Sequence, residues 1–221
     1  MVVIADEPLV HMVLPGISWE TYEKILDEIG ETHYRVTYAD GELEFMTLSF
    51  EHQNYGRWIG RLIFVLAQEF GQPLRTGGST TLKQVFQKKG LEPDECFWLQ
   101  NEKMMRGKKK WDALADPPPD LAVEVDITSS WLDRLSIYAD LKVAELWRFD
   151  GKSLKVLTLT ANGKYRERAR SLAFPSVPVD RLTTFIARVE DTEEVSLIQE
   201  FTTWLRKDVV GKKNGARKYE K

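Results

Sequence analysis

The chain has 221 residues, of which 43% are hydrophobic and 29% charged, a composition typical of a globular protein with one well-buried core. Its net charge of −3 and pI near 5.8 exclude a protein that coats nucleic acid through overall charge, because such binding scales with the phosphates neutralised. The apolar runs are far shorter than the roughly 20 residues that cross a bilayer, and acids near the N-terminus do not suit a signal peptide, so we expect a cytoplasmic protein without a membrane partner.

The N-terminal third predicts a helix, a hairpin and a second helix. Apolar residues at the spacing of one helical stripe indicate a helix from Ser18 to about Gly30. Two alternating stretches, 34–39 and 42–47, flank Asp40-Gly41, a dipeptide that favours a tight hairpin turn. Ser49 then begins a long helix that ends before Gly71.

The middle of the chain predicts the strands of a sheet. We expect strands at 80–87, in LEPDECFWL (91–99) and in LAVEVDI (121–127), with a polar, basic loop at 100–119. Ser129 and Ser130 are candidate caps for a helix to about Lys142, and AELWRFD follows as the next strand. A strand, helix, strand unit of this kind makes a parallel pair with a right-handed crossover.

The C-terminal part predicts a meander followed by one or two helices. Asp150-Gly151 and Asn162-Gly163 are hairpin turns that join LKVLTLT and KYRERAR to the sheet in antiparallel order. Helical periodicity runs from Asp180 to about Val209. We therefore expect an α/β protein with one domain over 1–209 and a basic tail over 210–221.

Two acids lie inside apolar strands rather than at their ends, namely Asp94 and Glu124. A buried carboxylate costs several kcal/mol unless it is paired or binds a metal, so both acids need partners. For each acid alone, a salt bridge to Arg75 or Arg134 is sufficient. Together, on adjacent strands, they can lie about 5 Å apart and share a hard divalent cation such as Mg²⁺ or Mn²⁺, which prefers oxygen ligands.

The order of these elements is that of the PD-(D/E)XK nuclease core, a restriction-endonuclease-like αβββαβ arrangement with a mixed sheet. The chain resembles the Uma-type family of putative restriction endonucleases in YADGELEFM, EHQNYGRWIGRL, EPDECFW and, most specifically, PDLAVEVDITSSWLDRLSIYADLKVAELWRFDG. The resemblance implies a Mg²⁺-dependent endonuclease in which Asp94 and Glu124 bind the metal. Water that is activated by the ion would then hydrolyse a phosphodiester bond.

The chain departs from the standard motif, which has lysine two residues after the glutamate where Asp126 stands here. In similar proteins a basic residue projects instead from the next helix, four residues before a tyrosine, and Arg134 occupies that position before Tyr138. A guanidinium cannot act as a general base, so we assign Arg134 an electrostatic role. Asp126 is either a third metal ligand or a strand-end cap, since alternation puts it on the face of Glu124.

Further candidates surround this pair. Glu42 and Glu44 share a face of the hairpin, and the resemblance suggests that this hairpin, and Glu44 above all, approaches the metal, whereas the alternative is a set of exposed strand acids. His52 is either structural or positions water or a phosphate. The basic loop, with Lys108, Lys109 and Lys110, either contacts a nucleic-acid backbone or is simply solvated.

Two functions from different classes remain after the sequence alone. The first is a metal-dependent endonuclease that cuts DNA, for which symmetric cleavage of a duplex would suit a homodimer. The second is a catalytically inactive nuclease fold that binds nucleic acid or protein, and the arginine at position 134 favours it. Metal binding by the acid pair distinguishes the two.

Overall fold

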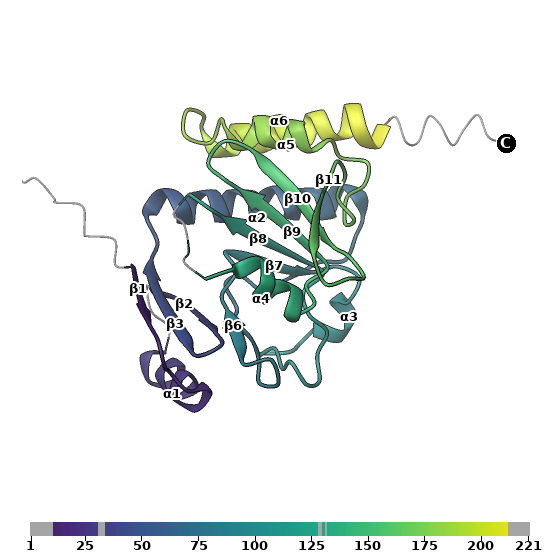
Figure 1. Ribbon diagram of the computed structural model, residues 1–221. Coiled ribbons are helices and arrows are strands. Elements are labelled where there is room, and N and C mark those ends of the chain that lie inside the picture. Colours follow the sequence, from purple (N-terminus) through teal and green to yellow (C-terminus); the bar gives the residue numbers. More distant parts are fainter. Residues whose placement is uncertain (1–10, 31–33, 128–129, 131, 212–221) are drawn as a thin grey trace, which may run out of the picture.

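The computed structural model describes residues 11–30, 34–127, 130 and 132–211. In this part of the chain two β-sheets lie side by side with helices packed around them (Figure 1). The larger sheet has the order β11-β10-β9-β8-β7-β4 and the smaller one β1-β3-β2-β6-β5. The predicted tail at 210–221 lies almost wholly outside the described residues.

The larger sheet is mixed, as the sequence predicts. Its strands are β4 (Arg75–Thr76), β7 (Glu95–Trp98), β8 (Leu121–Val125), β9 (Glu145–Phe149), β10 (Leu154–Leu159) and β11 (Tyr165–Arg168). Strands β8 and β9 are parallel, and the other neighbours in this sheet are antiparallel. The parallel pair and the antiparallel meander are thereby confirmed.

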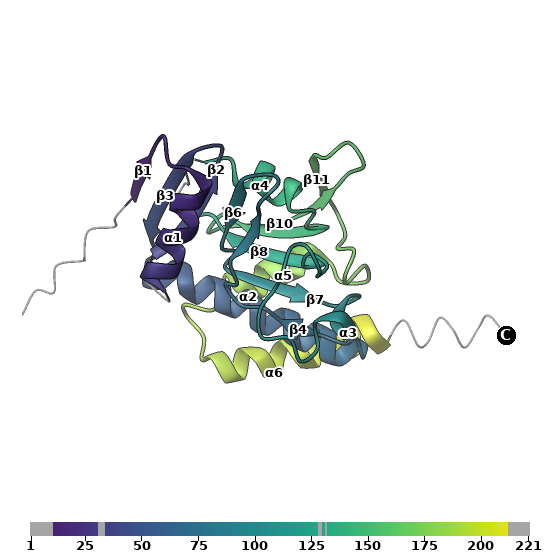
Figure 2. The ribbon, with the colours of Figure 1, turned by 90° about the horizontal axis from the view of Figure 1, so that it is seen from below.

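The smaller sheet carries the N-terminal helix on one face (Figure 2). Its strands are β1 (His11–Leu14), β2 (Tyr34–Ala39), β3 (Glu42–Thr47), β5 (Leu82–Gln84) and β6 (Lys89–Leu91). Helix α1 (Trp19–Ile29) begins after Ser18, whose hydroxyl accepts a hydrogen bond from the Thr21 amide. The ring of Tyr22 stacks on Tyr38 of β2 with centroids 4.7 Å apart. Alternation along β2 therefore turns its other face toward the larger sheet.

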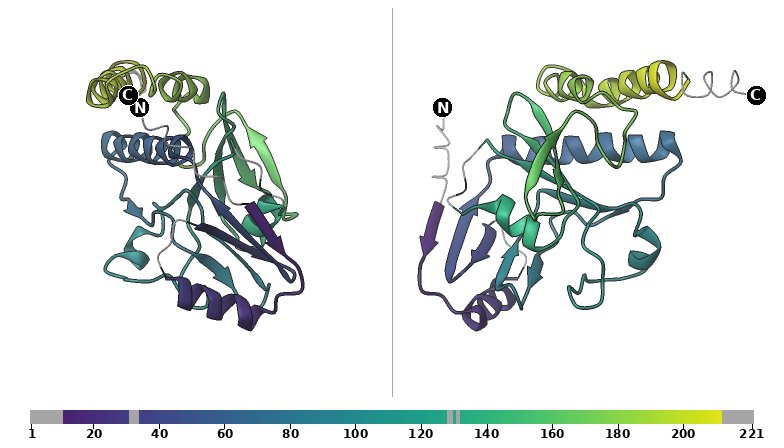
Figure 3. Two further views of the ribbon diagram at one scale, coloured as in Figure 1. Left: turned by 90° about the vertical axis from the view of Figure 1, so that its left-hand side faces the viewer. Right: turned by 45° about the vertical axis from the view of Figure 1, so that its right-hand side comes forward.

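Helix α2 (Phe50–Phe70) packs along the larger sheet, and its ends are those the sequence predicts. Ser49 caps its start and Gly71, with φ of 62°, ends it. Helix α5 (Val179–Ile186), helix α6 (Glu194–Trp204) and the π-helical segment Leu205–Val210 lie along α2 (Figure 3). Although α2 has 21 residues, no helix in the described ranges is apolar enough over a sufficient length to cross a membrane.

Three predicted elements differ from the structure. The strand expected at 80–87 is short and joins the smaller sheet, and β4 takes the place beside β7. The chain leaves the larger sheet after β4 at Gly77, where a Cβ atom would overlap the side chains of Cys96 and Trp98. The stretch 91–99 is divided between β6 and β7, because it turns from one sheet to the other around Pro93.

The helix after β8 begins later than the serines suggest. Helix α4 is Arg134–Asp140, and its cap is Asp133, whose side chain accepts a hydrogen bond from the Ser136 amide. Ser130 instead donates to Glu44, and Ser129 lies outside the described residues. With this change, the core reads α2, β4, β7, β8, α4, β9 and keeps the predicted αβββαβ order.

Candidate active site

The two predicted acids lie close together where the sheets meet. Strand β7 begins at Glu95, which pairs with Val123 of the antiparallel strand β8. The Asp94 amide donates to the Val123 carbonyl at 3.1 Å, so Asp94 lies just outside the regular ladder, beside the end of β8 that carries Glu124. Both acids are buried, with side-chain exposures of 4% and 9%. Helix α2 comes close because Gly56 faces Asp94, and a Cβ there would lie 3.1 Å from the Asp94 Cβ.

Arg35 of strand β2 bridges the two acids. Its Nη2 contacts Asp94 Oδ1, and its Nη1 donates to Glu124 Oε1 at 3.1 Å. The side chain of Arg35 is only 3% exposed, so this contact lies inside the protein. One guanidinium thus holds an oxygen of each carboxylate, and both carboxylates face the same point.

Arg134 and Tyr138 of helix α4 hold the other side of Glu124. Arg134 Nε lies 2.6 Å from Glu124 Oε1, and the Tyr138 hydroxyl donates to Oε2 at 2.6 Å. Arg134 also donates to Thr37 Oγ1 and to the Glu92 carbonyl. Burial lowers the pKa of the Arg134 guanidinium, but the Glu124 carboxylate outweighs burial and raises it. Arg134 is therefore a fixed positive charge that keeps Glu124 in place.

Asp94 is held by two further contacts. Its Oδ1 lies 2.9 Å from Nε2 of His52, which is fully buried near the start of α2. Its Oδ2 accepts a hydrogen bond from the Val125 amide at 2.7 Å. Burial raises the pKa of the Asp94 carboxyl, but Arg35 and His52 outweigh burial and hold this pKa below its usual value. Asp94 is therefore an anion near neutral pH.

The oxygen atoms of Asp94 and Glu124 are of the right chemical type for a divalent cation, but these two side chains alone do not supply all the ligands of such an ion. Two carboxylate oxygens converge on one positive group, as oxygen ligands of a hard cation would. Within the described ranges, however, no three His, Cys, Asp or Glu side chains gather in a group that could hold a metal ion. The remaining coordination positions would fall to water, which Mg²⁺ commonly retains. A cavity of about 440 Å³, lined by Arg35, Arg57 and Asp94 among others, gives such water and a substrate access.

Asp126 and Glu44 do not join the acid pair. Asp126 forms an ion pair with Arg148 of the neighbouring strand β9, and both side chains are partly exposed. Glu44 is 1% exposed and contacts His11 Nε2 at 2.8 Å and the Ser130 hydroxyl at 2.6 Å. Asp126 thus acts as an ion-pair partner at the strand end, and Glu44 ties β3 to β1 and to the segment after β8.

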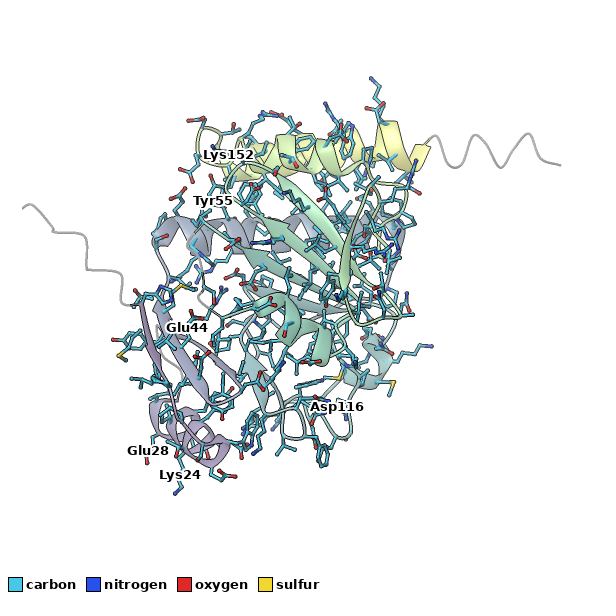
Figure 4. The ribbon with its side chains drawn as sticks, in the orientation of Figure 1. Lys24, Glu28, Glu44, Tyr55, Asp116 and Lys152 are labelled. Atoms are coloured by element: carbon cyan, nitrogen blue, oxygen red, sulfur yellow. The ribbon has the colours of Figure 1, made fainter. Side chains whose placement is uncertain are left out.

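The basic loop lies at the opposite end of β7 from Asp94. Lys108 forms an ion pair with Asp116 within the loop, and Lys109 and Lys110 are exposed. Figure 4 shows Asp116 well apart from Glu44. Asp94 precedes β7 and the loop follows it, so the lysines and the acid pair lie at opposite ends of this strand.

Sequence reasoning missed Arg35 and Thr37. Both lie on the face of β2 that points away from α1, because Val36 and Tyr38 occupy the α1 side. A charged residue at an inward position of a predicted strand was the available signal. Which acids it would meet depends on the packing of the two sheets, which no local pattern specifies.

Glu95, beside Asp94, makes stability depend on pH. Burial, followed by the nearby charge of Asp94, raises the pKa of the Glu95 carboxyl from 4.5 to about 7. Between these values the folded chain holds this proton and the unfolded chain does not, so stability is lost as pH rises through the window. After allowance for the solvent exposure of Glu95, we expect the free energy of unfolding of Glu95→Gln to rise by about 1–2 kcal/mol relative to that of the parent when the pH is raised from 5 to 8.

Urea unfolding of the two proteins at pH 5 and pH 8 measures this effect. Glu167→Gln, an exposed substitution on β11, is the matched control for the loss of one negative charge. Equal stability differences at the two pH values for Glu95→Gln would show that this carboxyl does not hold the proton.

A mixed sheet with a neighbouring pair of buried acids, flanked by α2 on one face and α4 on the other, defines a restriction-endonuclease-like α/β protein. The Uma2 family, described as "Putative restriction endonuclease", matches residues 19–185, and the chain belongs to this family. The crystal structure of a putative nuclease of the DUF820 group from Anabaena variabilis is similar, with a TM-score of 0.54 at 12% identity. The match covers 77% of this chain and 99% of that chain, and it shows the shared fold. No curated protein matches the chain.

Proposed function

We propose that this protein is a metal-dependent endonuclease that hydrolyses phosphodiester bonds in DNA. The observation that carries the proposal is the convergence of Asp94 Oδ1 and Glu124 Oε1 on one cationic group beside a cavity of about 440 Å³. Because the chain belongs to a family of putative restriction endonucleases, we infer that the substrate of this site is a nucleic acid. Both acids are held by contacts within the protein, so the site is formed before a substrate arrives.

Asp94 and Glu124 would hold a Mg²⁺ or Mn²⁺ ion. When bound, such an ion polarises the phosphate and lowers the pKa of a coordinated water. His52 and the Val125 amide orient Asp94, whereas Arg134 and Tyr138 orient Glu124.

Arg134 acts through Glu124 rather than on the phosphate, since its three nitrogens already contact Glu124, Thr37 and the Glu92 carbonyl. Arg57 is exposed and lines the cavity wall, and it forms no ion pair in the described part of the chain. It is therefore the residue of the site that is best placed to contact a substrate phosphate.

Cleavage of both strands of a duplex requires two acid pairs. A second copy of the chain would present the second pair, and a symmetric homodimer suits a two-fold related cut. The lysines at 108–110 and the basic tail would then contact the backbone away from the reacting phosphate.

Hydrolysis of bis-p-nitrophenyl phosphate and of supercoiled plasmid tests the proposal. The first substrate reports phosphodiesterase chemistry without a preference for any DNA sequence. We expect both reactions to require Mg²⁺ or Mn²⁺ and to stop in excess EDTA. Hydrolysis that continues in EDTA contradicts the metal requirement, and no hydrolysis of either substrate with Mn²⁺ contradicts the enzyme.

One observation supports a second candidate, a nuclease fold that binds nucleic acid without cutting it. Arg35 and Arg134 balance the charges of Asp94 and Glu124 without any metal. A binding module of this kind would bind DNA equally in EDTA and in Mn²⁺, with an affinity that falls as salt rises. Fluorescence anisotropy with a labelled duplex in both buffers distinguishes it from the enzyme.

A further inference from the structure

Arg35 lies at the position that an ion shared by the two acids would occupy. One of its terminal nitrogens contacts Asp94 and the other contacts Glu124. A cation that bonds to both carboxylates must approach the same two oxygens, Asp94 Oδ1 and Glu124 Oε1. The guanidinium and a divalent ion therefore exclude each other.

The other two oxygens of the pair are bound elsewhere. Asp94 Oδ2 accepts the Val125 amide, and Glu124 Oε2 accepts the Tyr138 hydroxyl and Arg134 Nη2. These contacts come from backbone and side chains on the far side of each carboxylate. The facing oxygens have partners of their own, since Asp94 Oδ1 also contacts His52 Nε2 and Glu124 Oε1 also contacts Arg134 Nε. Loss of the Arg35 contact alone would therefore leave both carboxylates oriented and free the space between these two oxygens for a new cation.

The cavity beside Asp94 offers Arg35 a second position. Arg35, Asp94 and Glu92 line the same cavity of about 440 Å³, which has room for a rotated guanidinium. The Glu92 carboxyl is partly buried, and it accepts a hydrogen bond from the neutral hydroxyl of Thr81 at 3.0 Å.

We propose that Arg35 is a resident counter-cation that orders the acid pair and is displaced toward Glu92 when a divalent ion binds. The inference rests on the proposed metal site of Asp94 and Glu124. Without metal, Arg35 offsets the mutual repulsion of two neighbouring carboxylates. With metal, the same residue is a competitor, so the affinity for the ion is lower than the two acids alone would give.

Calorimetric titration of Mn²⁺ tests the competition directly. Arg35→Met removes the charge and keeps an unbranched side chain, and we expect its Mn²⁺ dissociation constant to be at least about tenfold lower than that of the parent. Without metal, Arg35→Met should have a lower thermal midpoint, and saturating Mn²⁺ should restore it. Arg148→Met removes the arginine of the half-exposed Asp126 pair and should change neither quantity.

A second substitution separates displacement from a merely structural role. Glu92→Gln should weaken Mn²⁺ binding in the parent, because the displaced guanidinium loses its new partner. The same substitution should have no effect in the Arg35→Met background, where nothing is displaced. If Arg35→Met does not fold, Arg35→Lys takes its place in the experiment. A single ammonium cannot hold both acids as the guanidinium does, so we expect Arg35→Lys to bind Mn²⁺ more tightly than the parent.

The outcomes separate this inference from the proposed function. Unchanged or weaker Mn²⁺ binding by the Arg35 variant overturns the inference, as does an equal effect of Glu92→Gln in both backgrounds. Tighter binding together with no hydrolysis of bis-p-nitrophenyl phosphate leaves the inference standing and overturns the enzyme. If the parent hydrolyses the substrate but the Arg35 variant binds Mn²⁺ with unchanged affinity, the enzyme stands and the inference about Arg35 is overturned.

Discussion

Replacing Glu124 with alanine is expected to lower the free energy of unfolding by about 3–5 kcal/mol in the absence of metal. The substitution removes the carboxylate that contacts Arg35, Arg134 and Tyr138. Both arginines are buried, at 4% and 8% exposure, so neither can regain its lost interaction from water. The loss arises because Arg134 is left buried without a carboxylate partner and Arg35 keeps only Asp94, rather than from the missing side chain itself. Urea unfolding in EDTA measures it.

Asp126→Ala is the matched control for this loss. Asp126 lies two residues after Glu124 on the same face and also pairs with an arginine, but its side chain and that of Arg148 are 25% and 41% exposed. Such a pair contributes less than about 1 kcal/mol. If Glu124→Ala costs no more than Asp126→Ala, the network around Glu124 does not exist as described and the two acids await a partner.

Replacing Asp94 with asparagine should reduce the metal-dependent hydrolysis of bis-p-nitrophenyl phosphate by at least about 100-fold. The loss of a mere neighbour of a metal ligand commonly costs 10–100-fold, and Asp94 is proposed as a ligand itself. Asparagine keeps the shape of the side chain but removes the negative charge that faces Arg35 and Glu124. Initial rates at saturating Mn²⁺ measure the effect, with folding verified by circular dichroism.

The control for this prediction is Asp40→Asn, the same chemical change at a side chain that is 77% exposed. Asp40 has φ of 51° in the β2–β3 turn, a conformation that asparagine tolerates well. This variant should hydrolyse the substrate at the parental rate. Equal rates for Asp94→Asn and the parent would remove Asp94 from the catalytic residues.

The elements best predicted from the sequence are those whose ends carry local chemistry. Ser18 and Ser49 cap α1 and α2, and the turn at Asp40-Gly41 joins β2 to β3. Predictions failed where the chain changes sheets. Of the stretch 80–87 only Leu82–Gln84 forms a strand, and its partner is β6 of the smaller sheet, since strand propensity does not specify a partner.

The acid pair was predictable because charge inside an apolar strand is costly and therefore conspicuous. Of the two arginines considered as partners, Arg134 pairs with Glu124, whereas Arg75 donates to the Lys108 carbonyl. The bridging role of Arg35 was not predictable, because β2 and β7 belong to different sheets. Only the packing of those sheets brings a residue 59 positions away to Asp94.

The central claim is that Asp94 and Glu124 share one divalent cation, and a crystal structure of the protein soaked in Mn²⁺ tests it most directly. Anomalous diffraction at the manganese edge locates the ion independently of its surroundings. We predict one peak at ligand distance from both Asp94 Oδ1 and Glu124 Oε1, with the Arg35 guanidinium moved away. If the crystal is soaked at a saturating Mn²⁺ concentration, and Arg35 still bridges the acids with no anomalous peak between them, the claim is contradicted.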